Sequence, residues 1–353
     1  MDSRDRIEAL LNRKKIDRIP KYNFLSPHVR QKIRNIFNID DDFKINEIFD
    51  HDIIVVFIGN PSPWLVNDSD NLRNDGEIFK DNWGITYKTH NKNYGYHPTI
   101  IENPINKIET LEKYKFPDID NDNSFELLKE VVKKYKDEKY IIAGNTSTIF
   151  EGSWFLRGME NLLIDIHQGA DYIDLLFDKF VDYKIEVAKK AIKAGVDIIW
   201  LGDDLGMQDR MMLKPEIFRR YLKPRYYRII KKIKEYDKNI KVAFHTCGYI
   251  EPIIADFIDI EVDILNSIQP VNNISMVKRK YGKDLIFWGG IDIQNILPFG
   301  NKSEIVKEVK NKIDILGDDG GYIISGSNEI EYSDKLINNL FVYYWALEKY
   351  GKY

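Results

Sequence analysis

Residues 196–202 read VDIIWLG, a mostly apolar run followed at once by Asp203-Asp204-Leu205-Gly206. A run of this kind, without regular polar alternation, is typical of a strand buried on both faces in a parallel sheet covered by helices. Seven further runs resemble it, at residues 19–24, 52–57, 140–144, 241–246, 262–267, 285–290 and 321–325. Eight strands that alternate with helices predict an α/β fold, a single (β/α)8 TIM barrel over residues 1–353.

The intervals between the apolar runs have the amphipathic spacing of helices. Helices are predicted at residues 161–168, 170–194, 215–236, 250–260, 274–281, 303–316 and 336–350. The interval between the second and third strands is too long for one crossover and is predicted to be an insertion. Within it, residues 78–89 favour a β-hairpin with Asn82-Trp83-Gly84 near its turn.

The composition excludes several classes of protein. The 353 residues are 43% hydrophobic and 31% charged, which indicates a folded chain. The net charge of −4 lacks the positive excess that is typical of nucleic-acid-binding proteins. No stretch has the roughly 20 apolar residues that span a bilayer. The first residues show no signal peptide, and the single cysteine fits a reducing, cytoplasmic environment.

Polar side chains gather just after the predicted strands. In a TIM barrel the active site lies at the carboxyl ends of the strands, so these residues are expected to share one polar site at the barrel mouth. They are Asn145, Asp203, Asp204, His245, Cys247, Gln269, Asp292, Asn328 and Glu329. Adjacent carboxylates repel, so at least one of Asp203 and Asp204 is expected to point away, be paired or meet a cation. Either one of them caps the next segment, or one faces the mouth as metal ligand, general base or substrate anchor.

His245 and Cys247 are the most distinctive of these residues. Positions i and i+2 of a strand point to the same face, so an imidazole and the chain's only thiol would project together. Such a pair suits a thiophilic metal such as zinc, or a reactive-thiol site. A buried, inert cysteine beside a hydrogen-bonded histidine is the alternative.

Several motifs together carry a resemblance to a known family. They are Asp17-Arg18-Ile19-Pro20, Phe155-Leu156-Arg157-Gly158-Met159-Glu160, Gly202-Asp203-Asp204-Leu205-Gly206, His245-Thr246-Cys247-Gly248 and Trp288-Gly289-Gly290-Ile291-Asp292. With them the chain resembles the uroporphyrinogen decarboxylase-like superfamily, and more specifically its cobalamin-dependent methyltransferase branch. The Arg-Gln-Ala-Gly-Arg motif that holds tetrapyrrole carboxylates in true uroporphyrinogen decarboxylases is absent.

The resemblance implies a zinc site and a corrinoid. In that branch a His-x-Cys pair and a second cysteine near the last strand hold zinc, and a methyl group moves to or from the cobalt of a corrinoid. Here Asn328 stands at the second cysteine and Gln269 at an acidic position. Three readings stay open: a metal held by His245, Cys247 and an oxygen ligand such as Glu329 or Asp204; weak or substrate-dependent metal binding; or a site that works without metal.

The resemblance also implies roles and partners. Asp204, His245 and Cys247 are expected to be catalytic. Substrate binding is expected from Asn145, Arg157, Asp203, Gln269, Asp292 and Asn328. Because no Asp-x-His-x-x-Gly signature occurs, the corrinoid would arrive on a separate corrinoid protein or as free cofactor. The small-molecule methyl donor or acceptor is expected to be a methoxylated compound, a methylamine-type compound or a thiol, and the harder, oxygen-containing ligand set favours the first two.

Two other functions remain as alternatives. A decarboxylase or lyase of a smaller carboxylated substrate would need cationic side chains at the mouth, where Arg157 is the candidate. A corrinoid- or tetrapyrrole-binding protein without catalysis would explain Asn328 and Gln269.

Overall fold

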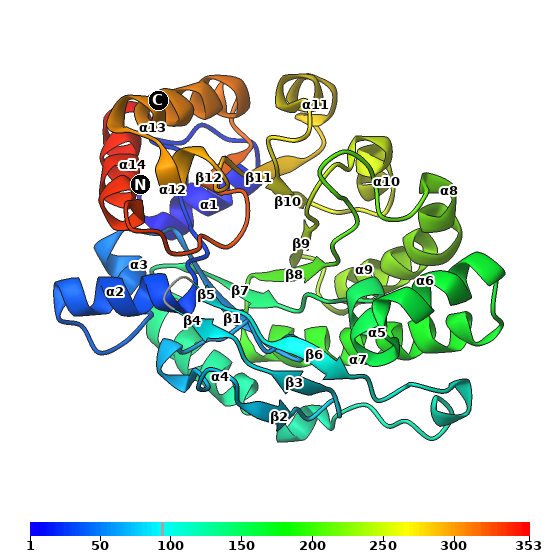
Figure 1. The fold of residues 1–353 in the computed structure, drawn as a ribbon. Helices are drawn as coiled ribbons and strands as arrows, with labels where there is room; N and C mark the ends of the chain where they lie inside the picture. Colours follow the sequence, from blue (N-terminus) through cyan, green and yellow to red (C-terminus); the bar gives the residue numbers. More distant parts are fainter. Residues whose placement is uncertain (93–94) are drawn as a thin grey trace.

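The computed structural model describes residues 1–92 and 95–353 and is built on a seven-stranded parallel sheet. Its strands are β1 (Ile53–Phe57), β7 (Tyr140–Gly144), β8 (Ile198–Gly202), β9 (Lys241–His245), β10 (Ile264–Ile268), β11 (Ile286–Ile291) and β12 (Tyr322–Gly326). Neighbours in the sheet follow this order, and helices lie around its outside (Figure 1). These seven strands were all predicted, and the fold is of the TIM-barrel type.

The predicted first strand, residues 19–24, is the one that the structure corrects. It forms no regular strand but lies between β12 and β1, joined to each by isolated backbone hydrogen bonds. The N–H of Ile324 donates to the carbonyl oxygen of Pro20 at 2.9 Å, and the N–H of Asp52 donates to that of Lys21 at 3.0 Å. Because Pro20 has no N–H to donate, a continuous ladder cannot form there. An irregular segment therefore closes the ring.

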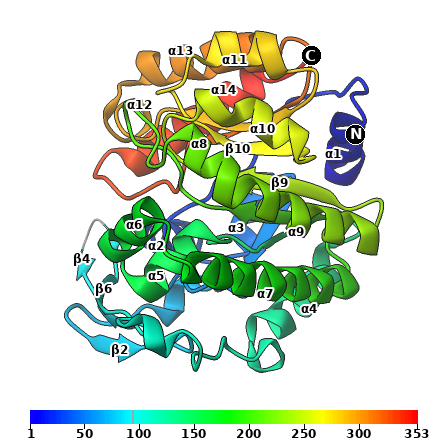
Figure 2. The same ribbon diagram turned by 90° about the vertical axis from the view of Figure 1, so that its right-hand side faces the viewer.

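Helices occur in each predicted interval, and further helices that were not predicted lie outside these intervals. The helices are α1 (Ser3–Leu11), α2 (Pro27–Phe37), α3 (Lys44–Ile48), α4 (Ser124–Tyr135), α5 (Phe150–Arg157), α6 (Met159–Gln168), α7 (Tyr172–Ala194), α8 (Pro215–Ile217), α9 (Lys223–Tyr236), α10 (Ile254–Asp259), α11 (Ile274–Tyr281), α12 (Ile296–Phe299), α13 (Lys302–Lys312) and α14 (Leu336–Tyr350). Of these, α1 to α5 and α12 are the ones that were not predicted. Single π-helical turns at Phe218–Leu222 and Ile313–Gly317 interrupt two of the predicted helices. Turned by 90°, the molecule shows α4, α7 and α9 side by side on its outer surface (Figure 2). Among the described residues, no helix combines the length and apolarity needed to cross a bilayer.

The insertion between β1 and β7 contains the predicted hairpin. β2 (Ile78–Lys80) pairs antiparallel with β3 (Thr86–Lys88), which also pairs with β6 (Thr99–Glu102). A smaller hairpin joins β4 (Asn91–Lys92) to β5 (Gly95–Tyr96). The buried Tyr87 donates its hydroxyl to the carbonyl oxygen of Pro61, in the loop after β1, at 2.9 Å. This contact ties the insertion to the carboxyl-terminal side of the barrel.

The core lies in two layers because alternate strand residues face opposite ways. One layer fills the barrel interior, where the Trp200 and Trp288 rings lie 4.9 Å apart, centre to centre. The other packs between the sheet and the helices and includes Ile199 and Phe287. Since the barrel interior is filled with side chains, a ligand of the barrel would bind at its mouth rather than inside it.

Candidate active site

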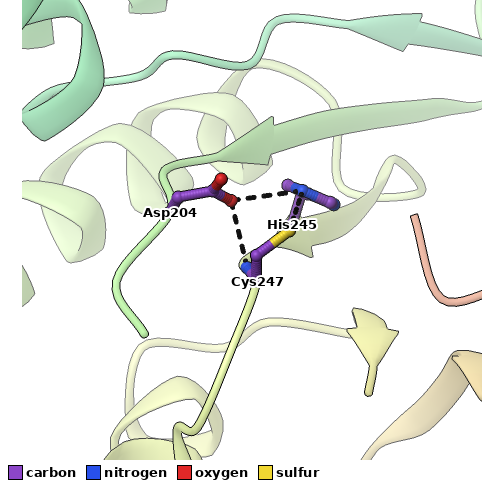
Figure 3. Close-up of side chains that lie close together, drawn as sticks. All are labelled: Asp204, His245 and Cys247. Carbon is purple, nitrogen blue, oxygen red and sulfur yellow. Dashed lines mark hydrogen bonds and ion pairs between the residues drawn. The ribbon is translucent and has the colours of Figure 1, made fainter. Parts of the chain in front are cut away.

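Asp204, His245 and Cys247 converge at the carboxyl ends of β8 and β9 (Figure 3). His245 Nε2 lies 3.4 Å from Asp204 Oδ1 and 3.4 Å from Cys247 Sγ. The backbone N–H of Cys247 donates to Asp204 Oδ1 at 3.1 Å. One ligand atom from each of the three residues lies within 4.8 Å of the other two. The predicted His-x-Cys pair therefore meets an oxygen ligand, and that ligand is Asp204.

The two loops that carry these residues are joined backbone to backbone. The N–H of Gly206 donates to Cys247 O at 3.0 Å, and the N–H of Tyr249 donates to Met207 O at 2.7 Å. A Cβ on Gly206 would lie 2.6 Å from Tyr249 N, and Gly248 has a φ of +79°, so both positions need glycine. The metal-ligand candidates thus rest on one fixed unit.

The two adjacent aspartates have opposite roles. Asp203 is fully buried, and its carboxylate accepts the N–H groups of Ile149, Phe150 and Glu151 at 2.8, 3.1 and 2.9 Å and the hydroxyl of Tyr226. It therefore caps α5, since carboxylates satisfy the unpaired N–H groups of a helix start. Asp204 keeps 35% of its side chain exposed and faces the mouth. One aspartate therefore faces the mouth, while the other caps a helix that precedes it in the chain rather than the segment that follows it.

The environment sets the protonation of the three residues. Burial opposes the charge on His245, but the hydrogen bond and charge of Asp204 outweigh it, so the pKa of His245 is raised. Burial likewise opposes the charge on Asp204, yet His245 holds the pKa of that carboxyl below its usual value. Burial and the charge of Asp204 together raise the pKa of the Cys247 thiol well above its usual value. Without a metal, these shifts favour the charged forms of Asp204 and His245 and the neutral thiol of Cys247.

A neighbour orients the imidazole. His245 Nδ1 lies 2.6 Å from Asn266 Oδ1, an acceptor, so Nδ1 is assigned the proton and the ring donates there. This leaves Nε2 directed at Asp204 and Cys247, as in metal sites where a second group fixes the ligating imidazole.

The triad opens into a cavity of about 330 Å³ at the barrel mouth. Its wall includes Asp204, His245, Asn328 and Glu329 among the predicted residues. It also includes residues that sequence reasoning missed: Phe24, Phe57, Trp64, Leu65, Thr146, Ser147, Glu151, Ile293 and Glu331. A volume in this range suits a small organic molecule.

Asn328 and Glu329 both line this cavity, but only Asn328 contacts the triad in the way expected from the sequence. The Asn328 amide donates to Cys247 Sγ at 3.1 Å, so it stands where a second thiolate was expected. Glu329, predicted as the third metal ligand, is not among the mutually close ligand atoms of the described residues. Its backbone N–H is held by the Asn328 side chain at 2.8 Å.

The other predicted substrate-binding residues serve the scaffold. Arg157 donates to Asp165 at 2.9 Å and to the carbonyl oxygen of Asn106 at 3.0 Å. Asp292 caps the chain before α12 by accepting the N–H groups of residues 294 and 295. Gln269 bridges Gly248 N–H and Ser327 O, and the fully buried Asn145 donates to Lys184 O at 3.0 Å. With Asp203, none of these residues lines the cavity.

Two further buried ionisable residues lie beside the site. Burial, and then the charges of Asp204 and Asp203, raise the pKa of Glu151 well above its usual value. Lys184, from α7, donates to Gly59 O, Asn60 Oδ1 and Thr146 O at 3.1, 3.1 and 2.7 Å, and burial lowers its pKa to about 7. Its ammonium joins the loops that follow β1 and β7.

Comparison with known proteins gives one family and one fold. A family model described as uroporphyrinogen decarboxylase (URO-D) matches residues 81–338. Uroporphyrinogen decarboxylase of Staphylococcus aureus (strain JH9) is 25% identical over 197 residues, which are 52% of this chain and 54% of that protein. The chain thus spans about half the length of the curated relatives it matches. A solved methyltransferase from Methanosarcina mazei is similar in fold, with a TM-score of 0.72 and 16% identity over 99% of each chain.

Proposed function

The chain belongs to the uroporphyrinogen decarboxylase family, and on that premise we propose that it is a methyltransferase. It moves a methyl group between a small substrate and the cobalt of a corrinoid, with a zinc-type metal at the barrel mouth. The observation that carries the proposal is the convergence of Asp204, His245 and Cys247 at the wall of a small cavity. The fold shared with a methyltransferase is in keeping with it.

The donor set fits zinc. Imidazole nitrogen, thiolate sulfur and carboxylate oxygen are its usual ligands, and a catalytic zinc keeps three protein ligands and one open position. Ligand atoms about 2.0–2.3 Å from a tetrahedral zinc lie about 3.3–3.8 Å from one another. The distances from His245 Nε2 to Asp204 and to Cys247 are both 3.4 Å. His245, Cys247 and Asp204 would therefore hold the ion, with Asn328 as a donor to the sulfur.

A bound zinc would act as a Lewis acid towards an oxygen or nitrogen of the substrate and would stabilise the Cys247 thiolate. The chain's own groups prepare that chemistry. Asn266 holds His245 with Nε2 towards the site, and the hydrogen bonds between the two loops keep Asp204 beside it. Glu151, whose pKa is raised by burial and by the charges of Asp204 and Asp203, lies on the cavity wall, where its carboxyl could give a proton to a leaving group.

The corrinoid approaches from outside the barrel. A cavity of about 330 Å³ admits a small substrate but not a corrin macrocycle. We therefore propose a separate corrinoid protein, or free cobalamin, as the partner that docks over the mouth. A reducing cytoplasm would keep Cys247 available as a ligand.

The test combines metal analysis with methyl transfer. Purified wild-type protein should bind one zinc, and Cys247→Ala and Asp204→Asn should lose it, while Asp292→Asn, a matched change outside the cavity, should not. With zinc supplied, cob(I)alamin should convert to methylcobalamin, followed by its visible spectrum, with a methyl ether, a methylamine or an S-methylated thiol as donor. Equal zinc in wild type and Cys247→Ala, or spectral silence across all three donor classes, would overturn the proposal.

The decarboxylase alternative lost its main support. Arg157, its candidate cation, is paired with Asp165, and no Lys or Arg is among the described residues that line the cavity. A carboxylated substrate would therefore meet carboxyl groups rather than cations. Carbon dioxide release without a corrinoid would revive this alternative.

A further inference from the structure

The cavity wall has an unusual combination of side chains. Four carboxyl groups line it, from Glu151, Asp204, Glu329 and Glu331. Four aromatic rings line it as well, from Phe24, Phe57, Trp64 and Trp200, whereas His245 is the one basic side chain among the described lining residues. Carboxyl groups and aromatic rings with no Lys or Arg among the described lining residues favour a cation over an anion, because a bound cation stabilises the ionised form of a carboxyl group.

The rings form a continuous surface. Phe24 and Phe57 lie 5.1 Å apart, centre to centre, and Phe57 and Trp200 lie 5.8 Å apart. Trp200 in turn meets the edge of His245 at 5.8 Å. Trp64, from the loop after β1, packs edge-on against Phe155 and adds a further ring to the wall. The aromatic surface therefore runs from the rim of the cavity to the Asp204–His245–Cys247 triad.

Two of the carboxyl groups each have one oxygen without a hydrogen-bond partner, and they also act on each other: after burial, the charge of Glu331 is the next largest cause that raises the pKa of Glu329. Glu329 Oε1 and Glu331 Oε2 are buried and accept no hydrogen bond from any described residue. The positive charge of Arg30 acts on Glu329, but the Arg30 guanidinium donates its hydrogen bonds elsewhere. It donates to Asp42 at 2.8 Å and to the carbonyl oxygens of residues 66 and 67. His97 lies 4.0 Å from Glu331. Buried oxygens without a partner cost free energy, so a cationic ligand between them would be favoured.

We infer that this cavity binds a quaternary ammonium group, such as the N-trimethyl end of choline or tetramethylammonium. The inference rests on the proposed function, because an N-methyl group at this place lies beside the triad. A quaternary ammonium has no N–H and spreads its charge over methyl groups, so it gains from ring faces and nearby carboxylates together. A bare metal ion would need oxygen ligands around it and would gain little from the four rings.

The test measures binding without any corrinoid. Calorimetry on zinc-loaded protein compares choline with 3,3-dimethylbutan-1-ol, a neutral molecule of the same shape, and adds tetramethylammonium as the minimal probe. Choline should bind at least about tenfold more tightly than its neutral analogue. Glu329→Gln and Glu331→Gln should each weaken choline binding about tenfold and leave the neutral analogue unchanged. Glu186→Gln, on the exposed side of α7, is the matched control and should change nothing.

The rings need their own variant. Phe57→Leu keeps an apolar side chain but removes a ring face, and it should weaken tetramethylammonium binding about threefold to tenfold. Circular dichroism and thermal unfolding check that each variant is folded. If Glu329→Gln does not fold, Glu331→Gln and the comparison of choline with its neutral analogue still test whether the cavity selects the cation.

The outcomes separate this inference from the proposed function. Equal affinity for choline and its neutral analogue, or no effect of either glutamate variant, would overturn the inference. Methyl transfer from an ether by a protein that binds no ammonium probe would overturn it alone. Selective choline binding without methyl transfer from any donor would instead refute the proposed function and leave the cation site standing.

Discussion

Replacing each of two adjacent aspartates separates folding from metal binding. The Asp203 carboxylate is buried and accepts four hydrogen bonds, three of them from backbone N–H groups at the start of α5. In Asp203→Asn an NH2 group replaces one oxygen and faces at least one of these donors. Hydrogen bonds to a charged group contribute about 1.5–3 kcal/mol each, so the free energy of unfolding should fall by about 2–4 kcal/mol.

Asp204→Asn should leave the stability nearly unchanged and weaken zinc binding. Its side chain is 35% exposed, and the amide oxygen can still accept the N–H of Cys247. The free energy of unfolding should therefore change by about 1 kcal/mol or less, as for partly exposed ion pairs. Zinc binding should weaken strongly, because a neutral amide is a poorer ligand than a carboxylate.

The assay keeps the two effects apart. Urea unfolding of metal-free protein, followed by circular dichroism, gives stability without the contribution of bound metal. Chelator competition then gives the zinc affinity of the folded variants. An Asp203→Asn protein as stable as wild type, or an Asp204→Asn protein that keeps its zinc affinity, would refute this division of roles.

Three further predictions concern the same region. Asn328→Cys places a thiol beside Cys247 Sγ and should tighten zinc binding at least about tenfold, or about 1.4 kcal/mol, in chelator competition; unchanged affinity would show that residue 328 cannot reach the ion. Because burial and then Asp204 raise the pKa of the Cys247 thiol, iodoacetamide should alkylate metal-free protein slowly at pH 8, and Asp204→Asn, which lowers that pKa, should speed the reaction. Equal rates would contradict this account. Lys184 has a pKa of about 7 in the folded state and 10.5 when unfolded, so between these values the unfolded chain binds the extra proton and stability should rise with pH by up to about 1.4 kcal/mol per unit. Urea unfolding from pH 7 to 9 should show a smaller rise for Lys184→Met, and an identical slope would exclude a depressed pKa.

The sequence predicted the barrel because buried parallel strands have a local signature. Seven of the eight apolar runs became strands, and α11 and α14 have the predicted bounds. Residues 19–24 failed because strand assignment depends on partners from distant parts of the chain, and Pro20 interrupts those hydrogen bonds. Nothing within the segment itself reports which neighbours it will have.

The site was predictable in kind but not in detail. The spacing of His245 and Cys247 indicated a shared face, and the structure brings them together. Two things required the fold: that Asp204 rather than Glu329 joins them, and that Asp203 caps α5. Glu151 and Glu331 were missed, because a lone glutamate near a strand end has no pattern that sets it apart from a surface residue.

The backbone hydrogen bonds between the Gly206 and Gly248 loops have a consequence for the rate and reversibility of metal uptake. Two loops that are already held together lose little conformational entropy when an ion arrives, because that entropy was lost when the barrel folded. An ion should therefore enter in one fast phase, without a slow rearrangement of the chain. Its removal should likewise leave the mouth in the same shape, so that the apoprotein can be reloaded without refolding.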